Sequence, residues 1–186
     1  MLHVKHLKPF MAVVRHGNLS RAREELRRAQ SAVSRSIQEL ESWFGVSLFE
    51  RGPRQWLLTK YGQVLARRTE EAFAELQRAC VVLTERHPAC AARLRAAPFF
   101  SLSVHERRLE LLFAFAERKH ISTAAATVGI SQPAASMALY DIESSVGIPL
   151  FDRAHTGVAL NECGELLMEH VKRALALLRL ADGEIS

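Results

Sequence analysis

Two stretches of this chain decide its fold: residues 18–51, which read NLSRAREELRRAQSAVSRSIQELESWFGVSLFER, and residues 120–153, which read HISTAAATVGISQPAASMALYDIESSVGIPLFDR. A shift of 102 residues superposes the second on the first without a gap. The matching positions are Ala22, Leu26, Gln30, Ala32, Ser34, Ile37, Leu40, Glu41, Gly45, Leu48, Phe49, Arg51, Leu58 and Gly62 in one series, and Ala124, Val128, Gln132, Ala134, Ser136, Leu139, Ile142, Glu143, Gly147, Leu150, Phe151, Arg153, Leu160 and Gly164 in the other.

One register relates residues 7–79 to residues 109–181, which we call the first and the second copy. Most positions that are not identical exchange one apolar residue for another. Solenoid repeats are roughly 20 to 50 residues long, so this longer period indicates the tandem duplication of a whole domain. We therefore expect two domains, each with its own core.

The composition is that of an ordinary soluble globular protein with room for two small cores. The chain has 186 residues, of which 48% are apolar and 24% are charged. It contains no apolar run of about 18 residues that could cross a membrane, and residues 1–10 carry His and Lys where a signal peptide needs apolar residues. We expect a cytoplasmic protein.

Cysteine and histidine positions predict neither disulfides nor a metal site. Cys80, Cys90 and Cys163 are odd in number and lack the CxxC spacing, which favours reduced thiols with a structural role. The eight His residues are scattered without a convincing ligand spacing. Because a phosphate-binding glycine loop, a nucleophile elbow and a paired acid site are also missing from the sequence, we expect no enzyme activity and no cofactor.

Charge is distributed unevenly between the two copies. Residues 1–80 hold 14 Lys and Arg against 8 Asp and Glu, whereas residues 103–186 hold 8 against 11. The basic face therefore belongs to the first copy, and a nucleic-acid backbone is its natural acidic partner.

Helix and turn signals in the first copy predict three helices, a hairpin and a long helix. The three helices span about residues 4–15, residues 20–27 with Ser20 as the N-cap, and residues 30–44 with Gly45 as the C-cap. A turn at residues 51–55 joins two short extended pieces, and Thr59 caps a helix over about residues 60–85.

The second copy repeats this plan, with helices at about residues 106–118, 122–128 and 132–146, a turn at 152–157 and a long helix at 161–180. The connector between the copies is expected to form one short helix that is closed by Pro98. The predicted fold is mainly α, with two tandem winged helix-turn-helix domains, each followed by a long linker helix. The predicted boundaries are 1–87 for the first domain, 88–102 for the connector and 103–186 for the second domain.

The B-form major groove admits one α-helix, so a compact three-helix domain can present its third helix to the base edges. Both copies resemble the N-terminal DNA-binding domain of LysR-type transcriptional regulators, a bacterial family. In the first copy the resemblance is carried by residues 18–26 and 30–34, Ile37, Leu40, Glu41, Gly45, Leu48, Phe49, Arg51, Leu58 and Thr59. In the second it is carried by residues 121–125 and 131–134, Ser136, Ile142, Glu143, Gly147, Leu150, Phe151, Arg153, Leu160 and Gly164.

The resemblance implies that the long helices pair antiparallel as linker helices, and that two reading domains bind inverted half-sites of double-stranded DNA. The pair could form between two chains, as in a homodimer, or within one chain as a pseudo-dimer. The residues expected in this contact are Leu65, Phe73, Leu76, Leu167, Val171, Leu175 and Leu178.

Members of the family usually continue into an effector-binding domain, whereas this chain ends at Ser186. We expect the DNA-binding part of a longer regulator. A stand-alone protein without ligand control is the alternative.

In the first copy the resemblance and the helix faces point to a group of polar side chains as DNA contacts. Arg51 has a competing structural role, since a salt bridge could hold it, and Arg23 stands where the family pattern has a small Ala. For the whole group the alternative is a merely solvated surface. The candidates are Arg21, Gln30, Ser31, Ser34, Arg35, Gln38, Arg51 and Arg54.

In the second copy the third helix has no Lys or Arg, so two interpretations stay open: it contacts DNA, or it is a folded partner that supplies a linker helix. The corresponding interaction-module hypothesis has the chain forming mixed dimers with other regulators. The candidate DNA contacts here are Ser131, Gln132, Pro133, Ser136, Tyr140, Arg153 and His155.

Overall fold

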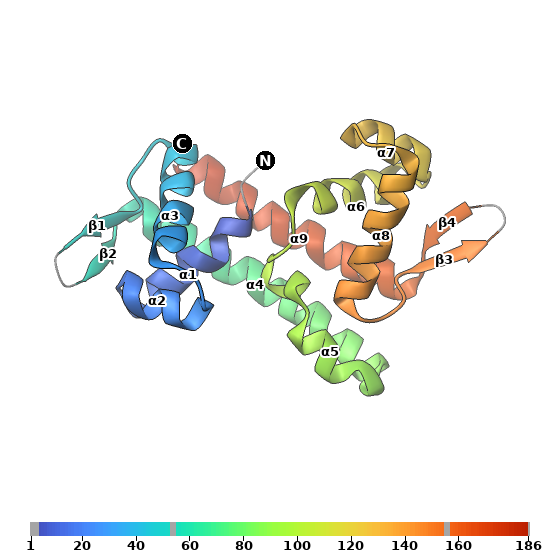
Figure 1. Ribbon diagram of the computed structural model, residues 1–186, viewed down its shortest axis with the longest axis horizontal. Coiled ribbons are helices and arrows are strands. Elements are labelled where there is room, and N and C mark those ends of the chain that lie inside the picture. Colours follow the sequence, from blue (N-terminus) through green and yellow to red (C-terminus); the bar gives the residue numbers. More distant parts are fainter. Residues whose placement is uncertain (1–3, 53–54, 155–156, 186) are drawn as a thin grey trace. The chain divides into compact units, whose positions relative to one another are not determined.

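The computed structural model describes residues 4–52, 55–154 and 157–185, and its elements follow the same order twice (Figure 1). The first series is η1 (Val4–His6), α1 (Leu7–His16), α2 (Leu19–Leu26), α3 (Gln30–Phe44), β1 (Phe49–Arg51), β2 (Trp56–Leu58) and α4 (Lys60–Arg86). The connector forms η2 (Pro88–Cys90), α5 (Ala91–Ala96) and η3 (Pro98–Ser101). The second series is α6 (Glu106–Arg118), α7 (Ile121–Val128), α8 (Gln132–Val146), β3 (Phe151–Ala154), β4 (Gly157–Leu160) and α9 (Glu162–Ile185).

The predicted fold class is confirmed: the chain is mainly helical, and each three-helix set is followed by an antiparallel hairpin and a long helix. The registers of the hairpins also correspond. Phe49 pairs with Leu58 in the first hairpin, and Phe151 pairs with Leu160 in the second.

The contacts divide the chain into two compact units. Unit 1 contains Met1–Phe73 and Ala174–Ser186, and unit 2 contains Ala74–Arg173. Each unit therefore holds one three-helix set, one hairpin and a segment of both long helices.

In unit 1 the core lies where α1, α3 and the hairpin meet. The rings of Phe10 and Phe49 are 5.4 Å apart, and those of Phe49 and Trp56 are 5.6 Å apart. The Leu-Phe pair of the repeated motif thus returns the chain to the core after α3. Fully buried apolar side chains in this core include Leu7, Phe10, Val13, Ala22, Val33, Ile37, Leu40, Leu48 and Leu65.

The predicted cap of the second helix is wrong. Asn18, not Ser20, is the N-cap of α2: its backbone is extended and its Oδ1 accepts a hydrogen bond from the Arg21 amide at 2.9 Å. Asn and Ser are about equally good caps. Because Asn18 follows directly on Gly17, a left-handed residue that ends α1, it occupies the first position where a new helix can start.

The early part of α4 lies against the late part of α9 in unit 1. Arg67 donates to Glu184 at 2.8 Å, and Nε of Arg68 donates to the same carboxylate at 3.0 Å. The prediction ended the last helix near Leu180, but α9 continues to Ile185. Buried Ala181 and Ile185 extend its apolar stripe at helical spacing, which explains the extra turn.

The core of unit 2 includes the connector. Leu94, Phe99, Phe100 and Leu102 are buried together with the inward faces of α6 and α8. The expected short helix is present as α5, but this segment is a packed part of the unit rather than a loose link. The rings of Phe115 and Phe151 are 5.7 Å apart.

The late part of α4 and the early part of α9 run antiparallel in unit 2, as two contacts show. Nδ1 of His170 lies 2.7 Å from Oε1 of Glu75. Nε2 of His87, directly after the end of α4, lies 3.2 Å from the thiol of Cys163 near the start of α9. Arg78 also pairs with Glu75. Burial raises the pKa of the Glu75 carboxyl, but hydrogen bonds from Arg78 and His170 outweigh it, so the net pKa lies below its ordinary value.

We expect Glu75→Gln to lower the free energy of unfolding by about 1–2 kcal/mol at pH 7, because a nearly buried ionic hydrogen-bond acceptor is lost. The folded-state pKa of Glu75 is depressed, so its contribution is present above the unfolded-state pKa of about 4.3 and disappears as the pH falls through the folded-state value. Urea denaturation of the wild-type chain and of Glu75→Gln at pH 7 and pH 3 measures the pH dependence of this loss. An equal loss of unfolding free energy at the two pH values would contradict the prediction. Glu70→Gln, which changes an exposed side chain, is the control.

Two further properties concern the whole described chain. Cys80, Cys90 and Cys163 carry free thiols, of which Cys80 is buried. Within the described ranges, no helix combines the length and the apolarity that a bilayer crossing needs.

Candidate nucleic-acid interface

The turn between the second and third helices has the same hydrogen bonds in both copies. In the first, Arg27 adopts a left-handed conformation (φ 51°), and the Arg28 amide donates to the Arg23 carbonyl at 3.1 Å. In the second, Gly129 (φ 72°) takes the place of Arg27, and the Ile130 amide donates to the Ala125 carbonyl at 3.0 Å. Glycine adopts this conformation without strain, so the second copy has the less strained turn.

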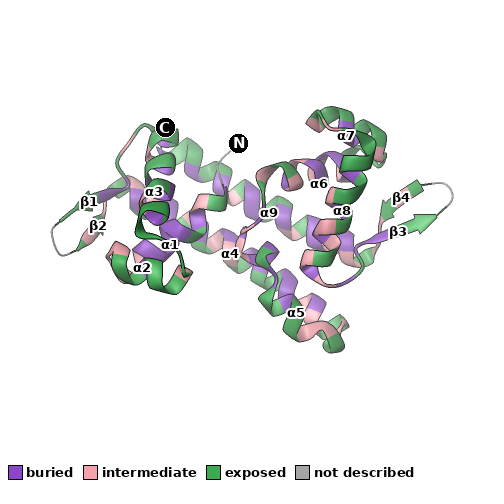
Figure 2. Cartoon of the chain, in the orientation of Figure 1, coloured by how far each residue is buried: buried purple, intermediate pink, exposed green. Residues whose placement is uncertain are grey.

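One face of α3 is buried and the other faces solvent (Figure 2). Val33, Ile37 and Leu40 pack inward, which turns the polar candidates outward. The Arg35 side chain is 80% exposed, and its Nε lies 3.6 Å from Glu39. Of the candidates on α2 and α3, Ser34 is half-buried, and the exposed ones are Arg21, Gln30, Ser31, Arg35 and Gln38.

Arg23 on α2 causes no packing conflict. Its side chain is exposed, whereas Ala125, at the corresponding position of the second copy, is buried. The helix thus accommodates the guanidinium at the surface.

The outward face of α8 carries different chemistry. Ser131 is the N-cap, since its Oγ accepts a hydrogen bond from the Ala134 amide at 3.4 Å. Ala135, Leu139 and Ile142 form the buried side. The candidates Ser131, Gln132, Pro133, Ser136 and Tyr140 are all exposed, and Met137 is exposed beside them.

Arg51 is held by the carboxylate of Glu41, a residue of the repeated motif that was not among the site candidates. Nη2 of Arg51 lies 2.6 Å from Oε2 of Glu41, and the guanidinium carbon lies 4.9 Å from the centre of the Trp56 ring. The other oxygen of Glu41 accepts hydrogen bonds from the amides of Leu48 at 2.9 Å and Phe49 at 3.4 Å. Glu41 therefore ties α3 to the start of the hairpin.

The second copy repeats this arrangement. Glu143 accepts from the amides of Leu150 at 2.7 Å and Phe151 at 3.1 Å, and its second oxygen lies 3.0 Å from Arg153. The signal in the sequence was a Glu and an Arg at matching positions of both copies. The hairpin candidates Arg54 and His155 lie outside the described residues.

We expect Glu41→Gln to lower the free energy of unfolding by about 1–2 kcal/mol, because the charge that supports two backbone amides and Arg51 is lost. Thermal denaturation followed by circular dichroism measures this. Glu39→Gln on the same helix removes only an exposed ion pair, and we expect it to cost less than about 0.5 kcal/mol. Equal effects of the two substitutions would mean that Glu41 does not fix the hairpin.

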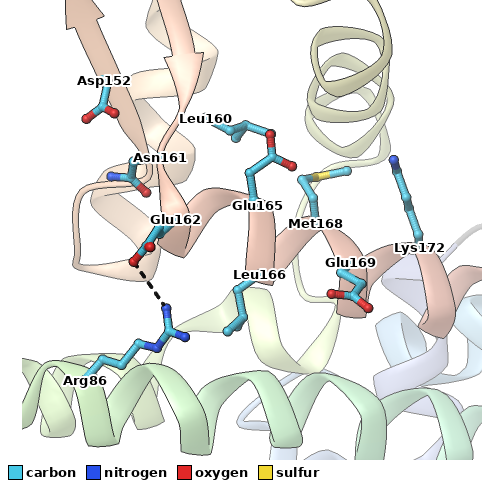
Figure 3. Close-up of a pocket in the computed structure, with 10 residues that line it drawn as sticks. All are labelled: Arg86, Asp152, Leu160, Asn161, Glu162, Glu165, Leu166, Met168, Glu169 and Lys172. Carbon is cyan, nitrogen blue, oxygen red and sulfur yellow. Dashed lines mark ion pairs between the residues drawn. The ribbon is translucent and has the colours of Figure 1, made fainter.

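A groove of about 770 Å³ opens in unit 2 beside the second hairpin (Figure 3). Four carboxylates and two cationic side chains line it, with Arg86 3.8 Å from Glu162. This charge balance disfavours a phosphate backbone at the groove. The lining residues are Arg86, Asp152, Leu160, Asn161, Glu162, Glu165, Leu166, Met168, Glu169 and Lys172.

Comparison with known proteins gives a consistent result. The family described as bacterial regulatory helix-turn-helix protein, lysR family, matches residues 4–63 and again residues 107–165. The HTH-type transcriptional regulator GalR of Pseudomonas putida is 35% identical over 99% of this chain, which covers 44% of GalR. GbpR of Azospirillum brasilense is 37% identical over 50% of this chain and 28% of its own length, and PerR of Escherichia coli is 37% identical over 51% and 32%.

This chain thus spans less than half the length of these relatives. No solved structure matches it. The family match covers most of both copies, and the relatives are named as transcriptional regulators. The chain belongs to the lysR family of bacterial regulatory helix-turn-helix proteins, whose class of function is DNA-binding transcription regulation.

Proposed function

We propose that the chain binds double-stranded DNA at specific sequences, with α3 in the major groove. The observation that carries this proposal is the outward face of α3, where an 80% exposed Arg35 and exposed Gln38 stand opposite a fully buried core face. Arginine and glutamine are the side chains that contact guanine and adenine through two hydrogen bonds. Gln30, Ser31 and Ser34 on the same helix supply further contacts.

Phosphate contacts come from the basic surface of the first copy. Arg21 on α2 is exposed close to the helix start, and Arg54, which lies outside the described residues, is the second candidate. Arg51 contributes through the charge that remains accessible beside Glu41, since its side chain is 43% exposed. Each neutralised phosphate adds to the salt dependence of binding.

We further propose that α4 and α9 act as linker helices within one chain and form an intramolecular pseudo-dimer. Six of the seven residues expected in this contact are buried in a single chain, and Phe73 is half-buried, which supports the proposal. The functional domains then follow the repeat, 1–87 and 103–186, with 88–102 as their connector. A homodimer through the same helices is the alternative, and sedimentation measurements distinguish the two.

The relatives named above are longer proteins, so we propose that this sequence acts as the DNA-binding part of a longer regulator. In that case the control of binding by an effector belongs to the rest of the protein.

One observation favours a second candidate function. No Lys or Arg occurs from Ile121 to Val146, so the second copy could bind a protein partner and form mixed dimers with other regulators. Combined Arg35→Ala and Arg54→Ala substitutions abolish the regulatory activity of the chain if it acts by binding DNA. They leave that activity unchanged if the chain acts by pairing with another regulator.

Selection from a random duplex library at roughly physiological salt tests the proposed function. We expect the intact chain to enrich a defined sequence, and Arg35→Ala to reduce that enrichment. Equal recovery of all duplexes would contradict sequence-specific binding and favour the interaction-module alternative.

A further inference from the structure

The two reading helices carry unlike side chains at equivalent positions. α3 begins at Gln30 and α8 begins at Gln132, so Met137 occupies the position of Arg35, and Tyr140 that of Gln38. The helices have equal length, and the same inward pattern buries Ile37 in one and Leu139 in the other. The correspondence is therefore structural as well as sequential.

Met137 and Tyr140 are available for contact. Their side chains are 62% and 55% exposed, and they lie one helical turn apart on the same face. A single exposed apolar residue needs no explanation, but this pair occupies the two positions that we assign to base contacts in the first copy. The core is complete without them, because Ala135, Leu139 and Ile142 form the buried side of α8.

The acidic side chain next to this pair on α8 is paired with a cation. Asp141 directly follows Tyr140 in α8. Its carboxylate lies 2.7 Å from the guanidinium of Arg108 on α6, so its negative charge is compensated. Arg118, Lys119 and His120 are exposed immediately before α7 and can contact phosphates there. An apolar face of α8 can thus approach DNA without a large repulsion.

We propose that Met137 and Tyr140 contact the C5-methyl groups of thymines, so that one chain recognises two unlike half-sites. The first half-site contains the guanine and adenine contacted by Arg35 and Gln38, and the second contains thymines contacted by the α8 pair. This inference rests on the proposed function. It makes the preferred operator asymmetric, in contrast to the palindrome that two identical domains select.

Binding to sites selected by the intact chain tests the thymine contacts directly. Replacing single thymines of the second half-site by deoxyuridine removes only a methyl group, and we expect about a fourfold loss of affinity for each contacted thymine. The variant Met137→Ala with Tyr140→Ala should be insensitive to that replacement, whereas Met137→Leu with Tyr140→Phe should keep the sensitivity. An unchanged thermal denaturation curve, followed by circular dichroism, shows that each variant is folded.

The second part of the test gives α8 the side chains of α3 at these two positions. Met137→Arg with Tyr140→Gln should change the selected second half-site toward the sequence of the first and make the operator more symmetric. Two identical half-sites for the wild-type chain, a single half-site, or no effect of deoxyuridine would overturn this inference while leaving DNA binding intact. Failure to enrich any duplex would instead refute the proposed function itself.

Discussion

Arg35→Ala is expected to weaken binding to the selected duplex by about 10- to 100-fold, because one bidentate contact to a base contributes about 1–3 kcal/mol of discrimination. The side chain projects from the outward face of α3, and its Nε lies 3.6 Å from the exposed Glu39. The substitution should therefore leave the fold unchanged. Fluorescence anisotropy with the selected duplex and with single-base variants measures the effect.

The salt dependence separates a base contact from a phosphate contact. If Arg35 contacts a base, its loss relaxes specificity at one position and leaves the slope of log affinity against log salt nearly unchanged. A uniform loss over all duplexes, with a slope reduced by about one, would assign Arg35 to a phosphate instead. Arg179→Ala, on an exposed part of α9, is the matched control and should change neither quantity.

Gly62→Ala should destabilise unit 1 by about 3 kcal/mol or more. A Cβ at this position of α4 would lie 2.1 Å from the backbone oxygen of Leu48, and that oxygen also accepts a hydrogen bond from the Thr59 amide at 3.0 Å. Backbone atoms on both sides must move apart to admit a methyl group, and overpacking of this severity is among the costly substitutions. Urea denaturation with a binding assay measures the loss.

The chain offers a control of the same chemical change. Gly183 in α9 has no atom within 4 Å of an added Cβ, so Gly183→Ala should be neutral or stabilise by about 0.5–1 kcal/mol. Gly164→Ala, at the position that matches Gly62, should behave like Gly62→Ala because its Cβ would lie 2.3 Å from the Leu150 oxygen. If Gly62→Ala proves as stable as the wild-type chain, the close approach of α4 to the hairpin is wrong.

Local chemistry was sufficient to predict most of the helix positions. The range of α3 follows from its buried face at helical spacing and from Gly45, which ends it in a left-handed conformation. Thr59 is predicted as the cap of α4 because it carries a hydroxyl. This hydroxyl accepts a hydrogen bond from the Gly62 amide at 3.1 Å. Such signals act within a few residues, so a single sequence contains them.

Other features depend on contacts that a sequence does not display. Asn18 and Ser20 are both good caps, and only the exit of the chain from α1 selects Asn18. Glu41 resembles a solvated acid until the fold brings the Leu48 amide to it. The burial of Phe99 in the connector likewise depends on tertiary packing in unit 2.

The candidate site divides in the same way. The outward position of Arg35 follows from the helix period. The ion pair between Glu41 and Arg51 could not be predicted without the geometry of the hairpin. The repeat itself contained a clue, because Glu143 and Arg153 stand at the matching positions and make the matching contact.

The central claim is specific recognition of double-stranded DNA. The most direct test is an anisotropy titration of the intact chain at about 150 mM salt, with its selected duplex and with a scrambled duplex of equal length and composition. We expect binding to the selected duplex to be tighter by about a thousandfold or more, as for specific DNA-binding proteins. Equal affinity for the two duplexes would contradict the account.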